Sequence, residues 1–111
     1  MSIAKKMQTA AHDGARLSAG QAFGEEITAA HPGLPALQWS AIEIGGTWYA
    51  SGSVAGVGGD AHVSRAVAAW AAVLGSEVSE TDQESSGTRA LETRGRFGEV
   101  EVTVWGILVG L

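Results

Sequence analysis

Two segments of the chain have the pattern of β-hairpins, and each follows a segment with helical character. The helical segments span residues 1 to about 30 and 60 to about 80, and the hairpins span residues 37–54 and 88–109. The order helix–hairpin–helix–hairpin predicts an α+β fold, in which an antiparallel sheet carries the helices on one face. This order argues against an enzyme built on a parallel sheet, because such a sheet needs strands that alternate with helices.

The sequence predicts the second helical segment more clearly than the first. Residues 60–80 carry an apolar stripe at three- and four-residue spacing, which predicts the core helix: Val63, Ala66, Val67, Trp70, Val73, Leu74 and Val78. Asp60 is a suitable N-cap, and Gly75 predicts that the helix frays or stops there. The first segment contains Gly14, Gly20 and Gly24. Each costs about 1 kcal/mol relative to alanine, so the segment is expected either to break near Gly14 or to need packing to hold it.

The first hairpin has Gly45 and Gly46 at its centre, which suits the positive φ of a two-residue turn. The register set by this turn sorts the side chains into two faces. The face expected to pack on the core carries Leu37, Trp39, Ala41, Trp48, Ala50, Gly52 and Val54. The other face is polar at its far end but apolar around Ile42, Ile44 and Tyr49.

The second hairpin is expected to turn near residue 97. This register places Arg96 beside Glu99 and Arg94 beside Glu101, a charge ladder that supports the pairing. The predicted core face carries Leu91, Val100, Val102 and Val104, and the opposite face carries Ala90, Trp105 and Ile107. A slip of one residue would exchange the two faces.

Composition limits the classes of protein to which the chain can belong. Its 111 residues predict a single domain, 1–111, and the net charge of −5 argues against direct nucleic-acid binding. The absence of cysteine excludes disulfides, thiolate nucleophiles and sulfur-ligated metals. No apolar run reaches the roughly 18 residues of a membrane span, and the polar residues after Lys5 and Lys6 do not form a signal peptide. A cytoplasmic location is therefore expected.

No arrangement of residues predicts catalysis. No serine stands in a G-x-S-x-G motif, and His12, His31 and His62 lack the spacing of metal ligands. The sequence therefore predicts a protein that is not an enzyme, with no catalytic residues, no metal site and no cofactor.

Two alternative binding sites remain open at this point. Residues 56–61 fit the pattern G-x-G-x-x-G/A, so Gly56, Gly58 and Gly59 form a possible anion-binding loop before a helix. The preceding strand belongs to a hairpin and Asp60 adds a negative charge, and both observations favour a simple helix entry. The acidic residues within 77–84 are expected to form a solvated connector, with a nucleic-acid mimic as the alternative.

The outer faces of the hairpins supply the predicted functional surface. Ile42, Ile44 and Tyr49 lie on the outer face of one hairpin, and Trp105 and Ile107 lie on that of the other. If both hairpins join in one sheet, these residues form an apolar patch away from the helices, and such patches usually mark an interface. The predicted function is non-catalytic protein binding, as a homodimer through the sheet face or with an unidentified protein partner.

Part of the chain resembles known proteins. The segments AVAAWAAVLG (66–75) and GRFGEVEVTVW (95–105) resemble small uncharacterised proteins of actinobacteria and of their phages and mobile elements. This resemblance implies no activity and transfers no functional residue. It is compatible with an inhibitor of a host factor or an assembly component. The order of elements is also similar to that of secretion-chaperone-like dimers, which bind client proteins.

Overall fold

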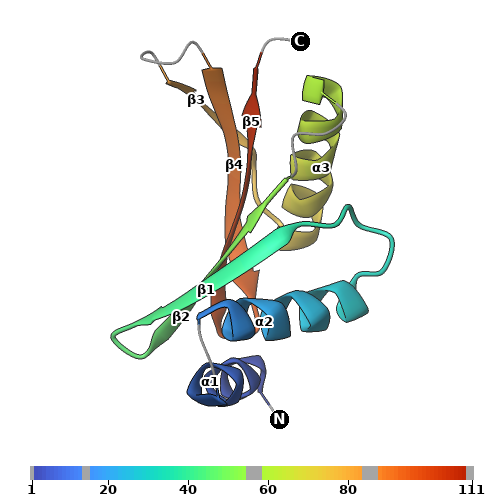
Figure 1. The fold of residues 1–111 in the computed structure, drawn as a ribbon. Helices are drawn as coiled ribbons and strands as arrows, with labels where there is room; N and C mark the ends of the chain where they lie inside the picture. The colour runs from blue at the N-terminus through green and yellow to red at the C-terminus, as the bar shows by residue number, and fades with distance from the viewer. Residues whose placement is uncertain (1, 14–15, 55–58, 84–87, 110–111) are drawn as a thin grey trace.

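The computed structural model describes residues 2–13, 16–54, 59–83 and 88–109. The α+β fold class is confirmed, because these residues form helices that pack on one sheet (Figure 1). The elements, in chain order, are α1 (Ile3–Asp13), α2 (Arg16–Ala30), β1 (Gln38–Ile44), β2 (Thr47–Ser53), α3 (Gly59–Leu74), β3 (Ser79–Gln83), β4 (Thr88–Phe97) and β5 (Val100–Leu108).

The sheet has five strands in the order β1-β2-β5-β4-β3. Three of the neighbouring pairs are antiparallel, but β2 and β5 are parallel, so the expectation of an antiparallel sheet was wrong and the sheet is mixed. The reason is β3, which was not expected. After α3 the chain runs through β3, β4 and β5, and this extra strand reverses the chain direction once more, so that β5 runs the same way as β2.

The core helix ends earlier than expected. It stops at Leu74 instead of continuing to about residue 80, because Gly75 takes a positive φ of 67°. The N–H of Ser76 donates to the carbonyl of Ala71 at 3.1 Å, and the N–H of Gly75 donates to that of Ala72 at 3.4 Å. This pair of bonds is a Schellman motif, which satisfies the last carbonyls of a helix. The chain then turns back along the sheet as β3.

The first helical stretch forms two helices, and the expected break at Gly14 lies outside the described residues. The glycines of α2 explain why this helix lies so close to β1. A Cβ at Gly20 would sit 2.7 Å from the carbonyl oxygen of Trp39, and one at Gly24 would sit 2.6 Å from Cδ1 of the same residue. The residues that weaken helical propensity are therefore the ones that permit this close packing.

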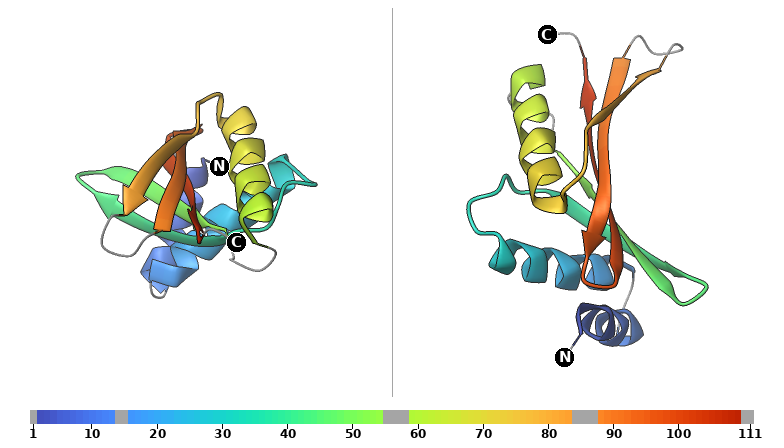
Figure 2. Two further views of the ribbon diagram at one scale, coloured as in Figure 1. Left: turned by 90° about the horizontal axis from the view of Figure 1, so that it is seen from above. Right: turned by 180° about the vertical axis from the view of Figure 1, so that it is seen from behind.

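The helices cover one face of the sheet, and the core lies between (Figure 2). The predicted register of the first hairpin is confirmed from Gln38 to Ser53, and its predicted core face packs against the helices. In the second hairpin, Phe97 pairs with Val100, so Arg96 lies beside Glu101 and not beside Glu99 as expected. The faces stay as predicted because this shift is two residues, and side chains alternate with a period of two.

Aromatic rings and one hydroxyl pair complete the core. Trp39 packs edge-to-face on Phe23 and Trp70, with ring centroids 5.0 and 5.5 Å apart. The buried Trp70 donates its indole N–H to the carbonyl of Pro35 at 3.0 Å. The buried hydroxyl of Thr93 lies 2.8 Å from that of Ser76, so β4 is tied to the residue that follows the C-terminal turn of α3. In the described part of the chain, no helix is long and apolar enough to cross a membrane.

Candidate interaction surface

The sheet face away from the helices, here called the open face, carries the residues predicted to form an interface. Four of them are large and exposed: Ile44 is 60% exposed, Tyr49 44%, Ile42 38% and Trp105 37%. Ile107 is half-buried. None of the described helices packs on this side (Figures 1 and 2). Because side chains alternate along a strand, the same alternation that fills the core aims these residues at solvent.

The structure divides these five residues into two groups. Ile42 pairs directly with Tyr49, and these two form the hairpin cluster together with Ile44. Trp105 and Ile107 form the β5 pair. Tyr49 pairs with Glu101, so Trp105 lies four residues further along β5, a distance of about 13 Å. The two groups share one face without forming one continuous patch.

A polar row separates the two groups. It contains Ser40, Ser51, Thr103 and Arg94, which lie side by side across four neighbouring strands. These residues line a shallow depression of about 400 Å³ on the open face, together with side chains of the hairpin cluster. The depression therefore offers an apolar wall and a polar floor.

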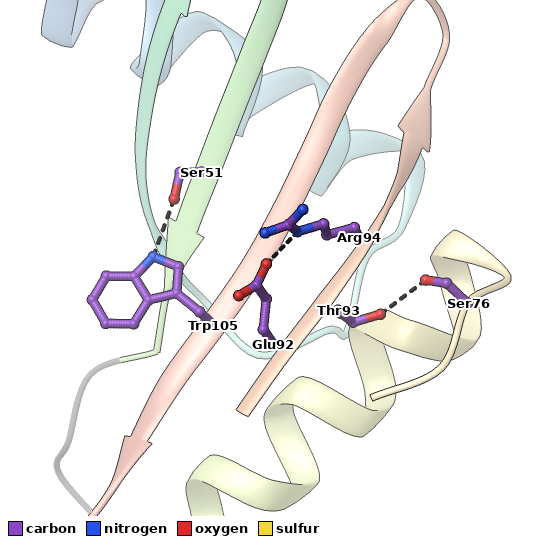
Figure 3. Close-up of polar contacts among 6 residues, drawn as sticks. All are labelled: Ser51, Ser76, Glu92, Thr93, Arg94 and Trp105. Carbon is purple, nitrogen blue, oxygen red and sulfur yellow. Dashed lines mark hydrogen bonds and ion pairs between the residues drawn. The ribbon is translucent and has the colours of Figure 1, made fainter. Parts of the chain in front are cut away.

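Several polar side chains of the open face have partners within the sheet. Trp105 donates its indole N–H to the hydroxyl of Ser51 at 3.1 Å, which lays the ring from β5 towards β2 (Figure 3). Arg94 forms an ion pair with Glu92. Arg96 pairs with Glu101 at 2.7 Å, and the hydrogen bond and charge of Glu101 raise the pKa of Arg96. These ion pairs compensate the charges of Glu92, Arg94, Arg96 and Glu101, and the large apolar side chains beside them remain exposed.

The predicted anion site is only partly described. Gly56 and Gly58 lie outside the described residues, and Gly59 begins α3 with a φ of 78°. Asp60 lies within the first turn of α3, not at the N-cap position. Its carboxylate accepts a hydrogen bond from the N–H of Val109 at 2.9 Å, so it joins the helix to the end of β5. It also places a negative charge at the helix N-terminus, where an anion would otherwise be favoured.

The acidic stretch 77–84 was expected to be a connector, but most of it forms the edge strand β3. Glu80 of this strand lies 2.7 Å from Arg89 of β4, across the pair of strands. Within the described residues, no group of three or more histidine, aspartate or glutamate side chains gathers in a way that could hold a metal ion. His31 instead packs its ring 6.0 Å from that of Phe97.

Sequence reasoning missed a groove between α2 and the start of β1. Its volume is about 1010 Å³, and it is lined by one shoulder of the helix and by residues from 34 to 39. The signal that pointed to it was the spacing of Gly20 and Gly24, because two glycines one turn apart let a helix approach a strand closely.

Comparison of the chain with protein-family models, with curated proteins and with solved structures gave no match.

Proposed function

We propose that this chain is a non-catalytic protein-binding module that forms a homodimer through the open face of its sheet. The observation that carries the proposal is the exposure of Ile42, Ile44, Tyr49 and Trp105 on a face that the described helices leave uncovered. Large apolar side chains gathered on one face usually mark an interface. Covering them removes apolar surface from water, which favours association by about 25 cal/mol for each Å².

The division of the face into two groups suits a symmetric dimer. Consider a twofold axis that lies parallel to the sheet and crosses the strands at the level of Ser51 and Thr103. This axis brings the level of the hairpin cluster in one copy to the level of the β5 pair in the other, because the two groups lie at equal distances along the strands on either side of Ser51 and Thr103. Stable dimers bury about 800 Å² on each copy, an area that requires both groups and the polar row.

Light scattering tests the proposal through the mass in solution. The wild type should have twice the mass of one chain, and a variant with both Ile42→Ser and Trp105→Ala should be a folded monomer. The two substitutions remove one anchor from each group, and truncating a buried interface anchor typically costs about 2 kcal/mol or more. Far-ultraviolet circular dichroism confirms that the variant is folded.

Val78→Ser is the matched control, because Val78 is also exposed, at 40%, but precedes β3 and lies off the open face. This variant should remain a dimer. A wild-type monomer, or a dimer that survives the double substitution, would refute the proposal. If the dimer is found, the resemblance to mobile-element proteins makes a host factor or an assembly component the first class of further partner to test.

A further inference from the structure

The groove between α2 and the start of β1 has the size of a small-molecule site. The chain leaves α2 at Ala30 and arches back to β1 along residues 31–37, and the groove opens between this linker and one shoulder of the helix (Figure 1). Its volume of about 1010 Å³ matches the larger pockets that bind small molecules. Gly24 packs directly on the ring of Trp39, so the helix and the strand meet there and close the groove at its base.

The linker that forms the outer wall of the groove is held in place. The carbonyl of Pro35 accepts a hydrogen bond from the indole N–H of the buried Trp70 at 3.0 Å. Pro32 and Pro35 also fix their own φ angles, which restricts the linker before the chain folds. Because the walls are already ordered, a ligand loses little binding free energy to the ordering of the site.

Two leucines supply most of the apolar surface in the groove. Leu34 and Leu37 both line it, and both are half-buried. Leu37 packs against both clusters of buried core residues, and a Cβ at Gly52 would sit only 2.8 Å from its Cδ1. Leu34 packs against one of these clusters. The core therefore fixes both leucines, and Ala29 and Ala36 extend the apolar surface beside them.

Polar side chains border this apolar surface. Gln21, Glu25 and Thr28 are exposed at successive turns along one side of α2, and Gln38 is exposed at the start of β1. A mostly apolar lining with a few hydrogen-bonding groups is typical of sites for small ligands.

One charge in the groove has no compensating partner. Glu25 carries the only formal charge among the described residues that line the groove. None of the ion pairs in the described ranges of the chain includes it. The chain as a whole carries a net charge of −5, so its field also attracts cations. A ligand that complements this groove therefore combines a positive charge with an apolar body.

We propose that the groove binds a small organic cation, in which an ammonium group is attached to a short apolar body. The ammonium group lies at Glu25, and the apolar body covers Leu34 and Leu37. The leucines supply most of the affinity and the carboxylate selects for the charge, because an exposed ion pair contributes less than the burial of apolar surface. The site is separate from the open face, so the proposal does not depend on whether that face forms a dimer.

A titration followed by ¹H–¹⁵N NMR tests the proposal with two probes of equal size. 2-Phenylethylammonium carries the charge, and 2-phenylethanol has a hydroxyl group in its place. The ammonium probe should bind with a Kd of about 1 mM, and its amide-shift changes should concentrate on residues 21–29 and 34–38. The alcohol should bind about threefold more weakly, and this difference should shrink in about 0.5 M sodium chloride, because salt screens exposed charges.

Glu25→Gln should weaken binding of the ammonium probe by about threefold and should leave binding of the alcohol unchanged. Glu77→Gln is the matched control, because Glu77 is also exposed but follows α3 and does not line the groove. It should leave the binding of both probes unchanged.

Three results would overturn the proposal. They are an absence of shifts at the groove with about 10 mM ammonium probe, equal binding of the two probes to the wild type, and an equal effect of Glu25→Gln on both probes. The ammonium probe should leave the number of chains per particle unchanged, so this test and the dimer test fail independently.

Discussion

Glu99 shows how one carboxylate can position a helix. It lies in the turn between β4 and β5, and its Oε1 accepts a hydrogen bond from the N–H of Ala4 at 3.1 Å, in the first turn of α1. This bond is the main cause of a lowered pKa of Glu99, with smaller contributions from its own N–H and from Ser2. A negative charge at a helix N-terminus is also favoured by the helix dipole.

Removing this charge should lower stability in a pH-dependent way. The pKa of Glu99 in the folded state lies below its ordinary value of 4.5, so its stabilising effect is complete above that pH and is lost as the pH falls through the folded value. Glu99→Gln should therefore unfold at a lower temperature than the wild type at pH 7. The difference should shrink as the pH falls below 4.5, as measured by thermal unfolding at several pH values.

Glu77→Gln serves as the comparison, since Glu77 is an exposed carboxylate on the segment after α3. It should match the wild type at every pH. A Glu99→Gln variant that equals the wild type at pH 7, or a deficit that does not shrink as the pH falls, would show that the contact with α1 does not stabilise the fold.

Among the elements, α3 depends on one residue for its end. Gly75 has a φ of 67°, and a Cβ built there would meet nothing within 4 Å. A substitution at this position therefore tests the backbone conformation alone. Gly75→Ala should lower the free energy of unfolding by about 1 kcal/mol in a urea titration, because a left-handed conformation costs an L-residue about that much.

Gly75→Asn should lose less, because asparagine tolerates this conformation better than alanine does. If alanine and asparagine cost the same, the loss would have a cause other than the left-handed backbone. The sequence alone indicated a stop at this glycine. It did not indicate that a strand follows, and the apolar pattern continuing to Val78 extended the expected helix too far.

The accuracy of the sequence predictions differed between the elements for physical reasons. The β1–β2 hairpin was predicted residue by residue because Gly45 and Gly46 specify the turn, with φ values of 58° and 85°. β3 was missed because its residues are polar and have low strand propensity, so its place is set by pairing with β4. The missing strand in turn gave the wrong direction for β5 relative to β2.

The candidate interaction surface could also be predicted only in part. Alternation alone placed Ile42, Tyr49 and Trp105 on the outer face, since the period of a strand depends on local sequence. Their spacing across the face depends on which strands are neighbours, and no local pattern specifies that. The groove beside β1 was missed for the same reason, because it forms between a helix and a strand that meet only in the folded chain.

For the whole molecule, the order of the strands predicts where the fold is most stable. β5 lies between β2 and β4, and its residues Val100, Val102 and Val104 are at most 1% exposed. β3 is a short edge strand. In native-state hydrogen exchange, amides of β5 should therefore exchange slowest and those of β3 fastest among the strands, because local opening costs most where contacts are densest.

Amides of β4 that point to β5 provide the internal reference and should exchange nearly as slowly as those of β5. Equal protection of β3 and β5 would mean that the sheet opens only as one unit. Exchange of β5 faster than that of β3 would contradict the arrangement of the strands itself.

The parallel pairing of β2 with β5 has a consequence for synthesis of the chain. Tyr49 meets Glu101 and Ser53 meets Trp105, so the middle of the sheet joins residues made far apart in time. Until residues 100–108 have left the ribosome, β2 and β4 each lack the neighbour that they share. The emerging chain therefore contains β2 and β4 without β5, the strand that joins them. The core can form cooperatively only after β5 has been synthesised. Folding is expected to be slow, because it depends on contacts between residues far apart in the sequence.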